Sequence, residues 1–64
     1  MCESDAYLKK GNSEEFYFKD VVSIRPVSDN ELLIQGLTGE QKKFRGRISR
    51  IDLVANKIWL EPQK

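Results

Sequence analysis

The stretch EEFYFKDVVSIRPV, residues 14–27, is the longest run of strand-forming residues in this chain of 64. Aromatic and β-branched side chains dominate it, which favours an extended strand over a helix. Lys19 and Asp20 interrupt the alternation, so we expect a bend or β-bulge at this point. Pro26 has no backbone N–H to donate, and the strand is expected to end near it or to lie at an edge. Phe16 and Phe18 are expected on one face of the strand before this bend, and Val22 and Ile24 continue that face after it.

Shorter segments on both sides of this strand also alternate between apolar and polar residues. They are residues 2–9, 31–37, 42–53 and 57–62. Turn-forming residues such as Gly11 and Asn12 separate the segments, and none of them has the period of a helix. Gly36 and Gly46 are expected where a strand bends or another backbone approaches closely. The expected inward-facing residues are Cys2, Ala6, Leu8, Leu32, Ile34, Phe44, Ile48, Ile51, Ile58 and Leu60.

Five short strands joined by tight turns predict an all-β fold, either a small five-stranded antiparallel barrel or an open sheet of the SH3 or Sm-like kind. Residues 1–64 are expected to form a single domain, because a chain of this length has room for one core only. Such a domain buries only about 60% of its unfolded surface, so a metal, a partner subunit or an unusually well-packed core has to add stability.

Composition excludes several classes of function. Eleven Lys and Arg against ten Asp and Glu leave a formal net charge of +1, far less basic than a typical nucleic-acid-binding domain. No signal peptide is expected, since Glu3 and Asp5 stand where positive charge belongs, and no apolar run reaches the roughly 20 residues of a membrane helix. We expect a cytoplasmic protein with a reduced thiol and no membrane partner. Without histidine there is no Ser-His or Cys-His pair, so we expect no enzyme activity.

The single cysteine, Cys2, follows Met1 directly. The α-amine of Met1, the amide nitrogen of Cys2 and the Cys2 thiolate can close two fused five-membered chelate rings on one metal ion. This planar, strong-field set suits Ni(II) or Cu(II) in a square-planar site and fits tetrahedral zinc poorly. The fourth ligand could be the backbone amide of Glu3, a water molecule or Cys2 of a second subunit.

Removal of Met1 would change the ligand set, because the amine and thiolate of Cys2 would then form a two-atom chelate. Two subunits related by a twofold axis would supply two sulfur and two nitrogen ligands. Two other interpretations of Cys2 remain open at this stage. One is a small buried residue that packs at the start of a strand, and the other is a disulfide between two copies, which a reducing compartment disfavours.

The chain resembles the CooT family of small nickel-binding proteins. The resemblance lies in the Met-Cys start followed by Ala6-Tyr7-Leu8, in the segment DVVSIRP at 20–26, and in RISRIDLVANKIWLE at 47–61. It implies a cytoplasmic, homodimeric Ni(II)-binding protein with a small β fold related to Sm-like proteins, associated with carbon monoxide dehydrogenase maturation. It also implies that Cys2 is the metal ligand, with backbone nitrogens of the N-terminus as companions.

RNA binding is the alternative function. It rests on a basic run along one predicted strand: Lys42, Lys43, Arg45, Arg47 and Arg50. Tyr7, Tyr17 and Trp59 could offer surfaces on which bases stack. A solvated strand face or a charged edge explains the run more simply, so nucleic acid is not the expected partner.

Large apolar residues are candidates for a dimer contact, because such side chains are common in the buried centre of protein interfaces. Phe44 and Trp59 are expected in the core or at such a contact. Leu33, Leu37 and Val54 are further candidates.

Overall fold

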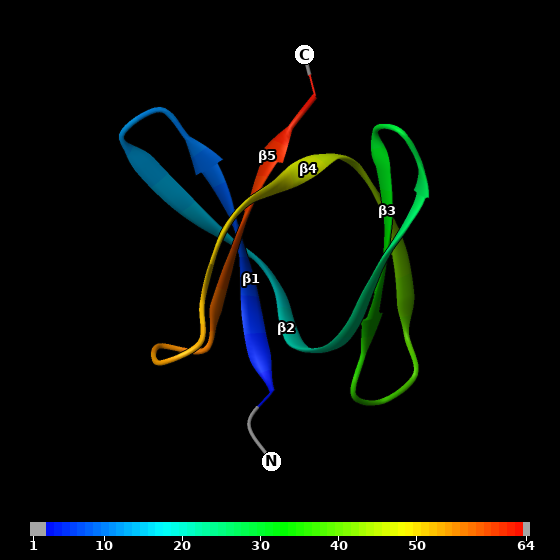
Figure 1. Cartoon of the computed structure of the whole chain (residues 1–64). Helices are drawn as coiled ribbons and strands as arrows, with labels where there is room; N and C mark the ends of the chain where they lie inside the picture. The colour runs from blue at the N-terminus through cyan, green and yellow to red at the C-terminus, as the bar shows by residue number, and fades with distance from the viewer. Residues whose placement is uncertain (1–2, 64) are drawn as a thin grey trace.

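The computed structural model describes residues 3–63, and five β-strands follow one another along the chain (Figure 1). The strands are β1 Ser4–Lys10, β2 Ser13–Ser28, β3 Glu31–Gly36, β4 Gln41–Asp52 and β5 Lys57–Pro62. Neighbouring strands pair in the order β1-β2-β3-β4-β5, and pairing of β5 with β1 closes a barrel. The predicted all-β fold is confirmed, in its closed form.

The two long strands, β2 and β4, each pair with two neighbours. The first part of β2 pairs with β1 and its second part with β3, while β4 pairs first with β3 and then with β5. The change of partner in β2 falls close to Asp20, which has a φ of 55°, and that in β4 falls at Gly46, which has a φ of 149°. The bulge expected at Lys19-Asp20 is therefore confirmed, and Gly46 lies where β4 changes partner, while the register shift of β4 falls between Ile48 and Arg50.

The closing pair, β1 with β5, is parallel, whereas the other four pairs are antiparallel. The sequence pattern had led us to expect antiparallel neighbours throughout. The difference has a simple geometric cause. When each of five strands runs opposite to the one before it, the first and fifth point the same way, so a ring can close only through a parallel pair.

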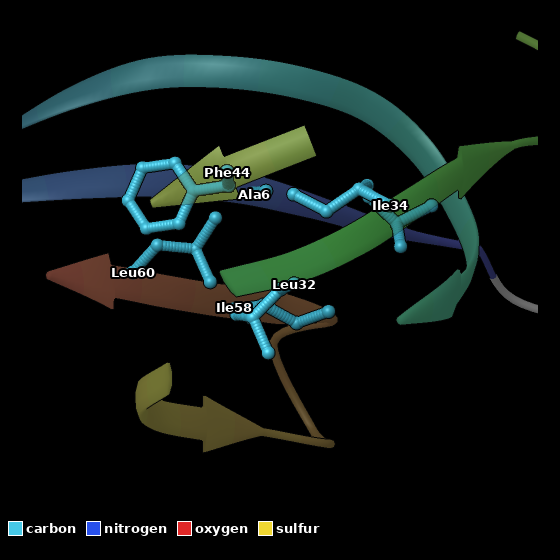
Figure 2. Packing of buried hydrophobic residues seen from close by; sticks show 7 residues of the cluster. Ala6, Leu32, Ile34, Phe44, Ile58 and Leu60 are labelled. Atoms are coloured by element: carbon cyan, nitrogen blue, oxygen red, sulfur yellow. The ribbon is translucent and has the colours of Figure 1, made fainter. Parts of the chain in front are cut away.

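The core is a small cluster inside the barrel (Figure 2). Leu32 and Ile34 of β3 meet Ile58 and Leu60 of β5 there, as their undisturbed alternation predicted. The remaining buried members are Ala6, Val21 and Phe44, and Leu8, Tyr17, Phe18 and Ile24 pack against the cluster. Cys2, expected to face inward, lies outside the described residues.

The single face expected for four residues of β2 was partly wrong, because bulges shift the alternation. Ala6 pairs with Phe18 but Tyr7 pairs with Phe16, so the strand has one extra residue between the two phenylalanines. Phe16 is consequently exposed and meets the Tyr7 ring edge-on at 5.7 Å. After the bulge at Asp20, Val21 enters the core and Val22, the expected residue, faces outward.

β4 also contains an extra residue, and two of its residues expected in the core are exposed. Ile48 pairs with Leu60, and Arg50 already pairs with Trp59, so Ser49 has no counterpart on β5. Ile48 and Ile51, both expected in the core, are exposed. Because Ile48 pairs with Leu60 and Ile51 pairs with Ile58, the bulge keeps both isoleucines on the side of these buried partners, where they line an open groove instead of the closed core.

Gly36 is closely packed by the side chains of Phe18 and Glu40, and not by another backbone as expected. A Cβ atom at this position would come within 2.8 Å of the Phe18 ring, closer than side-chain carbons approach one another. The strand β2 ends at Ser28, soon after Pro26, as the missing donor of proline predicted. Across residues 3–63 no helix is long and apolar enough to cross a membrane.

Candidate metal centre

The predicted ligands lie at the entrance to β1. Met1 and Cys2 are outside the described residues, and Glu3, half-buried, immediately precedes the strand. Figure 1 shows that this end of β1 lies at the same end of the barrel as the turn between β4 and β5, away from the C-terminus. The structure therefore defines where the chain reaches the barrel, two residues after Cys2.

The entrance to β1 is held from both sides. The Asp5 amide donates to the carbonyl of Asn56 at 3.0 Å, next to the parallel ladder with β5. On the other side Ser4 pairs with Val21, and the Asp5 carboxylate accepts the amide of Asp20 at 3.1 Å. Asp20 needs this partner, because its positive φ takes its amide out of the regular ladder. Residues from Ser4 onward are thus fixed by both neighbouring strands.

Residues 3–63 offer few side chains that could act as metal ligands. Among residues 3–63 no group of three or more histidine, cysteine, aspartate or glutamate side chains could hold an ion. The chain has no histidine, and its only thiol is that of Cys2. Carboxylates near the entrance already have partners, since Asp5 accepts the Asp20 amide and Asp52 accepts the amides of Val54 and Ala55. The described residues therefore offer no site that would compete with Cys2 for a soft or planar metal ion.

A rigid turn stands beside the entrance. Asp52 ends β4, and one of its carboxylate oxygens accepts the amides of Val54 and Ala55, both at 3.0 Å. These hydrogen bonds, that of Ala55 above all, lower the pKa of Asp52 below its ordinary value. Asn56 then takes a φ of 57°, a conformation that asparagine tolerates better than most residues. The turn at 53–56 is thus ordered by its own sequence.

An apolar groove of about 280 Å³ lies next to the same entrance. Its lining includes Ser4 of β1, Val22 and Ile24 of β2, Ile48 and Ile51 of β4, and Leu53 of the turn. Sequence reasoning missed this surface, because it placed the aliphatic residues of β2 and β4 in the core. The sequence indicated this groove only through its number of isoleucine and valine residues, which is larger than a small barrel can bury.

The basic run on β4 is largely neutralised by neighbouring groups. Arg45, Arg47 and Arg50 form ion pairs with Glu31, Glu61 and Asp52 respectively. The Lys42 ammonium lies 4.4 Å from the centroid of the Tyr17 ring. Within residues 3–63, Lys43 alone among the five has neither an ion pair nor a cation–π contact. This arrangement is that of a solvated strand face.

The two large aromatic residues have different surroundings. Phe44 is in the core, as expected, and its ring meets that of Tyr17 at 5.4 Å. Trp59 faces outward from β5, and its indole N–H donates to Glu14 at 2.9 Å. The Arg50 guanidinium lies 4.8 Å from the indole centroid. Trp59 is therefore packed by charged neighbours and belongs neither to the core nor to the apolar groove.

Known proteins resemble this chain over nearly its whole length. A family model, described as CO dehydrogenase accessory protein CooT, matches residues 1–61. An uncharacterized protein of Methanothermobacter thermautotrophicus is 32% identical over 63 residues, which cover 98% of this chain and 92% of that protein. An uncharacterized protein of Methanocaldococcus jannaschii is 34% identical over 61 residues, which cover 95% and 98%.

A solved structure shares the fold. The crystal structure of a protein assigned as CooT from Carboxydothermus hydrogenoformans matches with a TM-score of 0.88 and 30% identity, over 98% of this chain and 100% of that one. The family is described as an accessory protein rather than as a catalytic enzyme. The family match runs from the Met-Cys start into β5, and the chain belongs to the CooT family of CO dehydrogenase accessory proteins.

Proposed function

We propose that this protein binds Ni(II) through its N-terminus and serves, as a homodimer, in supplying nickel to carbon monoxide dehydrogenase. The observation that carries the proposal is the donor inventory. The chain has no histidine and a single thiol, placed at the second residue, and residues 3–63 contain no competing cluster of metal-ligating side chains. The family description, an accessory protein of CO dehydrogenase, supplies the nickel enzyme that would receive the ion.

The ligands would be the Cys2 thiolate and backbone nitrogens. With Met1 retained, its α-amine and the Cys2 amide complete two fused chelate rings, and the Glu3 amide, a water molecule or a second Cys2 provides the fourth ligand. With Met1 removed, the amine and thiolate of two Cys2 residues form the site. A planar arrangement of these donors suits a d8 ion such as Ni(II), whereas zinc, which also binds thiolate, prefers a tetrahedral arrangement.

The barrel fixes the point from which the N-terminal residues extend. Because Ser4 and Asp5 are fixed between β2 and the turn at 53–56, Cys2 is tethered to a rigid point by two peptide units, a reach of about 7 Å. The ligating atoms therefore stay at one end of the molecule. Such a peripheral site suits delivery, since an ion held by a terminus is accessible to an acceptor protein.

Binding to Cys2 also implies a pH dependence. The thiolate is the form that ligates, so metal uptake releases the thiol proton and weakens as the pH falls. The amide nitrogen of Cys2, where it ligates, loses a proton as well. Both effects act in the same direction.

Nickel titration of the wild type and of Cys2→Ser tests the proposal. Wild-type protein is expected to develop thiolate-to-nickel charge-transfer absorption that saturates, and Cys2→Ser is expected to show none. A double variant, Cys2→Ser with Ser4→Cys, keeps one thiol but moves it two residues from the amine. It is expected to lose tight binding, because the fused chelate rings can no longer close. Equal nickel affinity in the wild type and Cys2→Ser would overturn the proposal.

A further inference from the structure

Trp59, the only tryptophan of the chain, lies on the outer side of the barrel, between the buried residues Ile58 and Leu60. It borders a polar hollow of about 200 Å³, which we call the Trp59 hollow. The lining consists of Lys9, residues 11–13, Glu14, Arg50 and Trp59. These residues come from four strands and one turn, so the hollow exists only in the folded barrel. The proposed metal site does not use it.

We propose that the Trp59 hollow binds a small molecule that consists of a flat ring and one carboxylate. The inference goes beyond the proposed function and does not depend on it.

The charges of the lining favour a ligand with one negative charge. Two cations, Lys9 and Arg50, stand against one carboxylate, that of Glu14. Glu14 already has partners, because one oxygen accepts the indole N–H of Trp59 at 2.9 Å and the other lies 3.8 Å from the Lys57 ammonium. Within residues 3–63 Lys9 has no ion pair. One anionic group on a ligand would balance the positive charge that the lining retains.

The Arg50 guanidinium is the group best suited to hold this anion. It carries five N–H donors in a planar fork, and its contact with Asp52 is long, at 3.5 Å from Nη2 to Oδ2. The other oxygen of Asp52 accepts the amides of Val54 and Ala55. Most donors of Arg50 therefore remain for a ligand, and the fork matches a carboxylate through two parallel hydrogen bonds.

The indole of Trp59 provides a flat surface for the ring of the ligand. Its hydrogen bond to Glu14 fixes its direction, and the Arg50 guanidinium lies 4.8 Å from its centroid. Aromatic rings pack favourably against both indole and guanidinium planes. A ring that bears a carboxylate can therefore contact the indole while the carboxylate pairs with Arg50.

The size of the hollow points to a single ring. Its volume of about 200 Å³ is below the roughly 300–1,000 Å³ of pockets that enclose larger ligands. A ligand of several rings would extend into solvent and gain little from the lining.

The Trp59 hollow is separate from the predicted metal ligands. Residues 11–13 follow the last residue of β1, whereas Met1 and Cys2 precede its first residue. Figure 1 shows the turn between β1 and β2 at the end of the barrel away from the N-terminus. A molecule in the hollow therefore does not cover the point at which the chain enters β1.

Titration of the metal-free protein with benzoate, followed by proton–nitrogen correlation NMR, tests the proposal. A chain with one tryptophan gives one indole N–H signal, which reports on the hollow directly. Benzoate is expected to shift this signal and the amide signals of residues 11–13, and to saturate with a Kd of about 1 mM or below. Benzamide has the ring without the charge and acetate the charge without the ring, and each is expected to bind about 10-fold more weakly or worse.

Arg50→Gln removes the guanidinium fork and is expected to weaken benzoate binding by about 10-fold or more. Arg45→Gln is the matched control. Arg45 lies on the same strand and has a similar contact with a carboxylate, 3.5 Å to Glu31, but does not line the hollow. This variant is expected to bind benzoate like the wild type. Cys2→Ser is expected to do so as well, so failure of the nickel site leaves this proposal standing.

Four results would overturn the proposal. The first is an indole signal that shows no saturable shift with benzoate. The second is equal affinity for benzoate in the wild type and Arg50→Gln, or a loss in Arg45→Gln as large as in Arg50→Gln. The third is benzamide or acetate binding as tightly as benzoate, because the charge or the ring would then play no part. The fourth is tighter binding of inorganic phosphate than of benzoate, which would assign the hollow to phosphate groups.

Discussion

Gly46 shows how strongly a single residue constrains this barrel. It lies where β4 leaves β3 for β5, with a φ of 149° that only glycine adopts readily. A Cβ atom at this position would collide with the carbonyl group of Glu61 and come within 2.6 Å of the Phe44 ring. Both obstacles are rigid, one being backbone and the other a core aromatic ring.

Gly46→Ala is therefore expected to lower the free energy of unfolding by about 2–4 kcal/mol, since steric overlap adds to the cost of the backbone conformation. Gly11→Ala is the control, because Gly11 has a φ of 60° but open space around its Cα. It is expected to cost about 1 kcal/mol. Urea denaturation of both variants checks the difference. Equal losses would mean that the close approach at Gly46 carries no weight.

At the scale of elements, the turn at 53–56 depends on the ionised form of Asp52. The Ala55 amide, first among the groups around it, lowers the pKa of Asp52 from its ordinary 3.8, and the Val54 amide and Arg50 add to this effect. A depressed carboxyl pKa stabilises the fold above the unfolded pKa. This contribution disappears as the pH falls below about 4 through the folded pKa. Glu40 follows the same rule, because the Thr38 hydroxyl lowers its pKa.

Asp52→Asn keeps a side-chain oxygen that can accept the two amides but has no proton to gain. Its free energy of unfolding is expected to fall less than that of the wild type between about pH 5 and pH 2. Urea denaturation across this range makes the comparison. A wild type and an Asp52→Asn variant with parallel acid profiles would show that the turn draws no stability from the charge.

The elements also show what periodicity can and cannot predict. Leu32 and Ile34, like Ile58 and Leu60, occupy stretches without extra residues, and their alternation gave the correct faces. Ile48 and Ile51 are three residues apart in the sequence, and the unpaired Ser49 places both on the side of Leu60 and Ile58, where they are still exposed. A bulge of this kind depends on the partner strand, so its position cannot be read from the bulged strand alone.

The candidate site also has one part that could be predicted from the sequence and one part that could not. Cys2 could be identified from the sequence, because the chain offers no other soft donor and the chelate rings follow from covalent connectivity. The apolar groove could not, because residues of β1, β2, β4, β5 and the turn at 53–56 line it together. Chemistry carried by adjacent residues is visible in the sequence, whereas a surface assembled across strands becomes visible only in the fold.

At the scale of the whole molecule, the barrel unites three features at one end. The entrance to β1, the ordered turn at 53–56 and the apolar groove adjoin one another, and the C-terminus lies at the opposite end (Figure 1). A small closed barrel with few buried side chains has little stability to spare.

Nickel K-edge X-ray absorption of the nickel-loaded protein tests the central claim most directly, because it reports the atoms bound to the ion. A ligand set built on Cys2 and backbone nitrogens predicts a planar site with sulfur among the ligands and nitrogen completing the set. One sulfur per nickel would indicate a single Cys2, and two would indicate Cys2 from both copies. A six-coordinate shell of oxygen and nitrogen without sulfur would contradict the account.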